Sequence, residues 1–197
     1  MSDIYHLKVP GDERDRLIIG WMWLAVLSLA LAGLFSLLLV LSRTPVIGEV
    51  FPWLDFFQSA LVVHVNLSVL VWSLSFLAVV WSFSAGREIM PVGWLSLACA
   101  SVGTVLIAVA PFTDGAEPLL SNYIPVLQTP VFFAGLLVFA AGILLTVGRV
   151  LIAVPALSLT LSSDNVIRIG LLLTAITVLL AVAAFGMSWS GLPSRLA

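Results

Sequence analysis

The sequence predicts an all-α integral membrane protein, a bundle of five transmembrane helices, from its composition and from the spacing of its apolar runs. Hydrophobic residues make up 61% of the 197 residues and charged residues only 9%, and the mean hydropathy is +1.20. A soluble domain carries about a quarter charged residues. Because lipid solvates apolar helix faces and water does not, this composition favours a bilayer over solution.

Five segments each have roughly the 20 apolar residues that a helix needs to cross the hydrocarbon core. The first, 17–41, has 25 residues without a charge. It is longer than the apolar part of a signal peptide, about 7–15 residues, and no suitable cleavage site follows, so we expect a retained helix. The other segments are 56–83, 92–112, 131–152 and 169–189. Each is expected to be helical, because lipid offers no partner to open backbone groups.

Prolines mark several boundaries of these segments. Pro91 opens the third and Pro111 closes it, and Pro130 opens the fourth, where proline suits the first helical turn. The second segment is long enough to cross at a tilt. Arg149, near the end of the fourth, is expected to reach the headgroups by snorkelling. With no internal repeat, residues 1–197 are predicted to form one transmembrane domain.

Positive charge is distributed unequally between the two sides of the predicted bundle. The N-terminal side carries Lys8, Arg14, Arg16, Arg87, Arg149 and Arg168, and the opposite side carries Arg43 and Arg195. This bias predicts a cytoplasmic N-terminus and an outside C-terminus, in a bacterial cytoplasmic (inner) membrane. Six tryptophans near span ends are predicted to form an interfacial belt, whereas Trp72 falls mid-helix. The six are Trp21, Trp23, Trp53, Trp81, Trp94 and Trp189.

Several function classes are excluded by the sequence. The net charge is −2 and no run of Lys and Arg could follow a phosphate backbone, so no nucleic-acid partner is expected. Phosphate-loop, zinc and hydrolase motifs are absent. Asp114 and Glu117 lie in a proline-stiffened outer loop, which is expected to be solvated and to pack over the outer face of the bundle. The alternative is a docking surface for a basic partner.

Among the side chains in the predicted spans, His64 is the best candidate for a functional role. It lies eight residues into the second span, among apolar residues. Ionisable groups at membrane depth are costly and usually face a bundle interior or a functional site, and imidazole is a common axial ligand of haem iron. Ala60 and Ser68, one turn to either side, are small enough for a flat macrocycle to approach. In the alternative interpretation His64 only bonds a neighbouring helix. The other histidine, His6, lies in the charged tail.

The stretch Phe56-Phe57-Gln58-Ser59-Ala60-Leu61-Val62-Val63-His64-Val65-Asn66-Leu67 resembles the second helix of subunit I in the haem–copper oxidase superfamily (cytochrome c oxidase and the nitric oxide reductase large subunit). In that family the histidine of this helix is an axial ligand of the low-spin haem. His64-x-Asn66-Leu67, with Val71-Trp72, looks most like the nitric oxide reductase branch, and Val65 stands where many oxidases have glycine. Further matching stretches follow in the same order. They are Arg87-Glu88, Trp94-Leu95-Ser96, Asn122-Tyr123-Ile124-Pro125 and Phe132-Phe133-Ala134-Gly135.

The resemblance covers only the N-terminal five helices of a subunit I, which has many more. It therefore implies the N-terminal part of a split subunit I, or a truncated relative, that is not catalytic alone. His64 would be one axial ligand of a low-spin haem b, with Ala60 and Ser68 as shape-setting neighbours. The second histidine would come from a partner chain that carries the remaining helices.

The function that the resemblance implies is electron transfer toward oxygen reduction in a respiratory terminal oxidase. Its partners would be other membrane subunits and, on the outer side, an electron donor such as cytochrome c. One alternative is a subunit of a nitric oxide reductase-like complex. The other is a haem-free structural or assembly subunit, in which His64 is a packing residue.

Overall fold

The computed structural model describes residues 11–44, 56–84, 89–113, 115–120, 125–153 and 163–190. Within them five helices are long and apolar enough to cross a membrane, which confirms that part of the predicted fold class. They span Glu13–Leu41, Phe57–Phe83, Met90–Phe112, Pro130–Ile152 and Asn165–Ala184.

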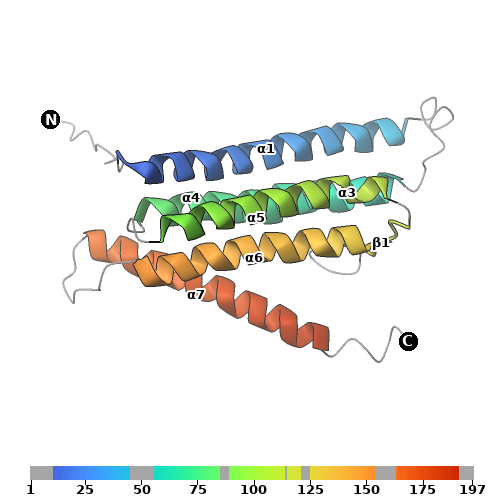
Figure 1. Cartoon of the computed structure of the whole chain (residues 1–197). Coiled ribbons are helices and arrows are strands. Elements are labelled where there is room, and N and C mark those ends of the chain that lie inside the picture. Colours follow the sequence, from blue (N-terminus) through green and yellow to red (C-terminus); the bar gives the residue numbers. More distant parts are fainter. Residues whose placement is uncertain are drawn as a thin grey trace.

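The helices form an up-and-down bundle in which successive crossings run in opposite directions (Figure 1). In order, the helical elements are α1 (Glu13–Ser42), α3 (Phe56–Val65), the π-helix η1 (Asn66–Val71), α4 (Trp72–Ser84), α5 (Met90–Val109), the 3₁₀ turn η2 (Ala110–Phe112), α6 (Pro130–Ala153) and α7 (Ser163–Ser190). Helices α3, η1 and α4 together make the second crossing. The first helix begins earlier than predicted, because the carboxylate of Asp12 accepts a hydrogen bond from the backbone N–H of Arg14 and caps it.

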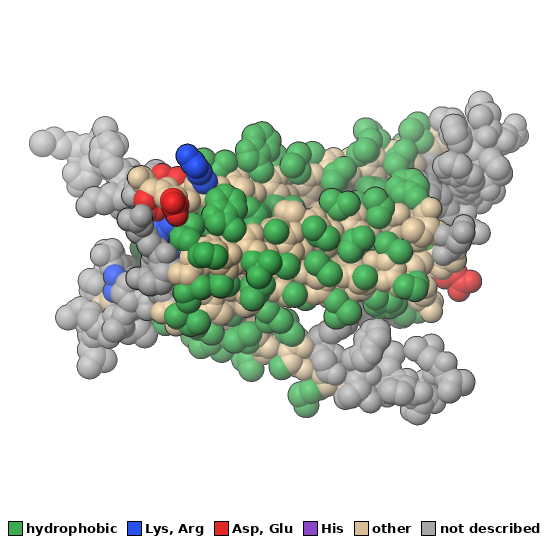
Figure 2. Space-filling view, viewed as in Figure 1, with side chains coloured by type: hydrophobic (Ala, Val, Ile, Leu, Met, Phe, Trp, Pro, Cys, Tyr) green, Lys and Arg blue, Asp and Glu red, His purple; other side chains and the backbone are tan. Residues whose placement is uncertain are grey.

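A short antiparallel hairpin lies between α5 and α6, at the opposite end of the bundle from the start of α1 (Figure 1). Its strands are β1 (Pro118–Leu119) and β2 (Val126–Leu127), with Pro118 opposite Leu127. We call this end of the bundle the hairpin end, and the end where α1 begins the Glu13 end. Figure 2 shows apolar side chains over the length of the visible face, with charged side chains confined to its two ends.

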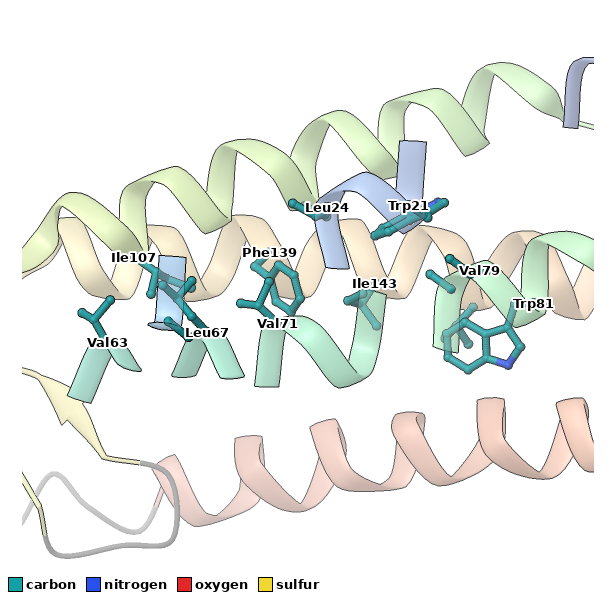
Figure 3. Packing of buried hydrophobic residues seen from close by; sticks show 14 of the residues in the cluster. Trp21, Leu24, Val63, Leu67, Val71, Val79, Trp81, Ile107, Phe139 and Ile143 are labelled. Carbon is teal, nitrogen blue, oxygen red and sulfur yellow. The ribbon is translucent and has the colours of Figure 1, made fainter. Parts of the chain in front are cut away.

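The core is built mainly from side chains of the first four crossings (Figure 3), and α7 adds Leu171 and Ala175. Helices α5 and α6 approach closely where glycines face the partner backbone. A Cβ atom added at Gly142 would lie 2.6 Å from the carbonyl oxygen of Ser96 and 2.7 Å from the backbone nitrogen of Ala100. Small residues at such contacts are typical of membrane helices, whose association depends on close packing.

The predicted tryptophan belt is only partly correct. Trp23 and Trp94 are 60% and 42% exposed, as an interfacial position requires, but Trp21 and Trp81 are fully buried. Trp81 donates its indole N–H to the hydroxyl of Thr174 and so connects α4 to α7. Position along a helix sets the depth of a residue, whereas the face that it occupies decides between lipid and core. Trp53 and the side chain of Trp189 lie outside the described residues.

The prediction that Arg149 snorkels outward is wrong. This side chain is 2% exposed, and its Nη2 lies 3.4 Å from the sulfur of Met90 on α5. A Cβ atom at Gly93 would lie 3.4 Å from Arg149 Nε. The absence of a side chain at Gly93 therefore leaves room for the arginine to lie against α5 at the Glu13 end of the bundle.

Candidate functional site around His64

The second crossing is not a continuous α-helix, since η1 begins two residues after His64. The side-chain nitrogen of Asn66 donates to the carbonyl of Val62 (2.8 Å), and the hydroxyl of Ser68 donates to the carbonyl of His64 (2.7 Å). Such bonds to the residue four positions back compete with the backbone hydrogen bonds of the helix. Short π segments inside α-helices are frequent at functional sites. Sequence reasoning missed this interruption, because similar bonds from Thr104 and Thr146 leave α5 and α6 as regular α-helices.

The imidazole of His64 is held by the first helix. Its Nδ1 lies 2.8 Å from the carbonyl oxygen of Ala32 on α1. A carbonyl only accepts, so Nδ1 carries the hydrogen, and in the neutral ring the lone pair is then on Nε2. Within the described part of the chain, Nε2 has no hydrogen-bond partner. Metal-ligating histidines almost always donate their other ring N–H to a carbonyl, a carboxylate or water, and the bond to Ala32 is compatible with ligation through Nε2.

The residues around His64 differ in the exposure of their side chains. His64, Val65 and Ser68 are partly exposed, whereas Ala60 is fully buried. Beyond them the same crossing presents Val69, which is 57% exposed, and Trp72, which is 38% exposed. The predicted neighbours thus play different parts. Ser68 is partly exposed and bonded to the His64 carbonyl, and Ala60 belongs to the buried core. Their contact with a haem stays a prediction.

An apolar surface continues from this site toward the Glu13 end. Trp72 stacks on Phe76 with ring centroids 6.2 Å apart and an angle of 23° between the planes. Phe76 is itself 47% exposed. The second crossing therefore carries partly exposed aromatic side chains on the Glu13 side of His64.

The loop between η2 and α6 is attached to this crossing by two polar side chains. Ser59 donates its hydroxyl to the carbonyl of Ala116 (2.9 Å), and Asn66 donates to the carbonyl of Pro125 (2.8 Å). This confirms that the loop packs over the hairpin end of the bundle. Glu117 is exposed, as a solvated loop requires. Asp114, Asn122 and Tyr123 lie outside the described residues.

Removing the Asn66 amide is expected to release the loop from the bundle. Asn66→Ala loses the bonds to Val62 and Pro125, each worth about 0.5–1.5 kcal/mol, and 1.4 kcal/mol corresponds to about a tenfold change in an equilibrium. We expect roughly tenfold faster cleavage of the loop between η2 and α6, measured by limited proteolysis and mass spectrometry. Gln128→Ala, an exposed position of the same loop, is the control, and equal cleavage rates in the two variants would contradict the anchoring role.

No group of three or more His, Cys, Asp or Glu side chains that could hold a metal ion occurs among the residues that the structure describes. A haem makes a different demand on the protein, because the porphyrin supplies the equatorial ligands of its iron. An axial histidine with a fixed ring orientation is what the protein adds. The geometry of His64 fits that requirement.

Comparison with known proteins finds similar bacterial sequences. The chain is 35% identical over 149 residues to an uncharacterised protein of Rickettsia prowazekii (strain Madrid E), a match that covers 64% of this chain and 29% of that protein. It is 33% identical over 115 residues to an uncharacterised protein of Aquifex aeolicus (strain VF5), covering 58% of this chain and 29% of that protein. The matched region thus spans less than a third of each relative. No protein-family model and no solved structure matches the chain.

Proposed function

We propose that this chain is part of a respiratory terminal oxidase-like complex in the bacterial cytoplasmic membrane, where His64 is one axial ligand of a low-spin haem b. The observation that carries the proposal is the hydrogen bond from His64 Nδ1 to the carbonyl of Ala32, which leaves Nε2 available on a partly exposed face. The resemblance of residues 56–67 to the second helix of a haem–copper oxidase subunit I supports the same assignment.

The protein's part in this function is to hold and shield the haem. Bound haem supplies one-electron redox chemistry, and its environment sets the potential. The carbonyl of Ala32 fixes the rotation of the His64 ring. Hydroxyl and amide bonds from Ser68 and Asn66 hold the backbone on either side. Apolar side chains along the second crossing, Val69, Trp72 and Phe76, would exclude water from the bound face once covered.

The remaining ligand and covering helices come from outside these five crossings. A second axial histidine requires a partner chain, or a further part of the same polypeptide, that packs over Val69, Trp72 and Phe76. The comparisons support this arrangement, because each relative extends well beyond the matched region. We place the Glu13 end in the cytoplasm from the distribution of Lys and Arg, and the electron donor, such as cytochrome c, at the hairpin end.

Two alternatives have observations in their favour. The run His64-x-Asn66-Leu67 favours a nitric oxide reductase-like complex, which uses the same haem ligand with a different substrate. The bond from His64 to Ala32 is also a helix–helix contact. In a haem-free structural or assembly subunit it would join α1 to α3 and nothing more.

The test is the haem content of the complex purified from its native membrane. His64→Ala is expected to remove the reduced b-type absorbance band assigned to this site, since the iron loses a protein ligand. His6→Ala, which replaces the other histidine, is the matched control and should keep the band. Unchanged haem content in His64→Ala would overturn the proposal. Turnover measured with oxygen and with nitric oxide then distinguishes an oxidase-like complex from a nitric oxide reductase-like complex.

A further inference from the structure

Four buried polar atoms at the Glu13 end have no hydrogen-bond partner among the described residues. They are Asp15 Oδ1, Trp21 Nε1, Ser75 Oγ and Ser82 Oγ. Trp21 and Ser75 are fully buried, and Ser82 is 1% exposed. Burying such a group unpaired costs about 1–3 kcal/mol by protein mutational data. More than 90% of buried polar groups are therefore bonded to protein or to ordered water.

The register of two helices places these atoms together. The bond from His64 to Ala32 fixes α1 against the antiparallel second crossing. Ser75 lies eleven positions after His64, and Trp21 lies eleven positions before Ala32. At 1.5 Å per residue Trp21 lies about 16 Å from that bond along α1. Ser75 lies somewhat closer, because the six residues of the π-helix η1 come between, so the two stand at about the same level. By the same count Ser82, eighteen positions after His64, stands within one residue of Asp15, which lies seventeen positions before Ala32, about two turns nearer the Glu13 end.

The sides of the helices on which these residues lie are consistent with their levels along the bundle. Ser75 and Ser82 are seven residues apart, which puts them on one side of α4 with the buried Ala78 between them. By the same count the part of α1 opposite them runs from Arg14 to Trp21, and its buried side chains are Leu17, Ile18 and Trp21. In Figure 3, Trp21 of α1 and Val79 of α4 lie in the same part of the core, well away from Val63 and Leu67.

We propose that the contact between α1 and α4, bounded by Asp15, Trp21, Ser75 and Ser82, is a binding site for internal water molecules. We call it the polar seam. Buried waters make about two to four hydrogen bonds to groups that otherwise lack partners. The indole N–H and the two hydroxyls supply donors, and the hydroxyls and the carboxylate supply acceptors. Asp15, in the first turn of α1, marks the entrance.

The seam is closed toward His64. The hydroxyl of Ser28 already donates to the carbonyl of Ala25 (2.8 Å) and needs no water. On either side of this level the contact is lined by fully buried apolar residues, Val71 and Leu67. Water thus enters from the Glu13 end and stops near the level of Trp21 and Ser75. This inference does not depend on haem binding at His64.

Radiolytic hydroxyl-radical footprinting of the full chain in lipid nanodiscs tests the seam, because X-rays split bound water and the radicals oxidise the side chains beside it. Trp21 and Trp81 are a matched pair. Both are fully buried, but the Trp81 N–H is satisfied by Thr174. We expect several-fold faster oxidation of Trp21 than of Trp81, read by mass spectrometry. Equal protection of the two tryptophans would overturn the proposal.

A double substitution checks that the water lies between the two helices. Ser75→Ala with Ser82→Ala removes two water ligands with little change in volume, and should lower Trp21 oxidation several-fold, toward the level of Trp81. Ser96→Ala is the control, since the Ser96 hydroxyl is buried but bonded to the carbonyl of Gly93. If Trp81 stays protected from oxidation in the double variant, the bundle is still intact. Trp21 oxidation that stays unchanged in the double variant would refute the seam.

Discussion

Gly142→Val is expected to force α6 away from α5 and to destabilise the bundle by at least about 1–3 kcal/mol, the usual cost of overpacking a core. The new Cβ would meet the carbonyl oxygen of Ser96 and the backbone nitrogen of Ala100 at 2.6 and 2.7 Å. Backbone atoms cannot move aside as the end of a flexible side chain can. The helices must therefore separate, and the dispersion contacts of their interface are lost.

Gly148→Val is the matched control for this prediction. Gly148 belongs to the same helix, but a Cβ added there meets nothing within 4 Å. Both variants change the intrinsic helix propensity of α6 in the same way. Resistance to unfolding by SDS, followed by the loss of helical circular dichroism, should fall sharply for Gly142→Val and little for Gly148→Val. Similar curves for the two variants would mean that the α5–α6 contact contributes little to stability.

The five membrane-length helices could be predicted because the free energy of membrane crossing depends on sequence-local properties. Each run is apolar over the required length, and prolines mark several of its ends. The predicted positions of the helix ends were less accurate. α1 begins at Glu13 rather than Leu17, since a polar cap and acidic residues stabilise the first turn outside the apolar run. α7 begins at Ser163 rather than at residue 169.

The contacts of individual side chains could not be predicted, because they depend on which faces meet. Trp21 and Trp23 are two positions apart, yet one is buried and the other is largely exposed. The burial of Arg149 depends on Gly93, which lies on another helix and far away in sequence. His64 itself was found from its depth in an apolar span. Its partner, the carbonyl of Ala32, has no sequence signal, since every residue carries the same backbone group.

Imidazole is expected to restore the haem band lost in His64→Gly. Glycine at this position leaves a cavity of the shape of the removed ring, beside the carbonyl of Ala32 that accepts from Nδ1 in the native protein. Added imidazole can then donate to that carbonyl and ligate through its other nitrogen, as the native side chain is proposed to do. The reduced b-type band should be largely absent without imidazole and return as its concentration rises.

His64→Leu is the matched control for this rescue, because its side chain fills the cavity and offers no ligand. Imidazole should leave the His64→Leu spectrum unchanged. The comparison separates an axial ligand from a packing residue, since a lost helix contact would not be repaired by a small molecule that coordinates iron. A band that persists in His64→Gly without imidazole would exclude His64 as the ligand. A loss that imidazole repairs equally in both variants would place the imidazole at another site, and the ring held by Ala32 would then be structural.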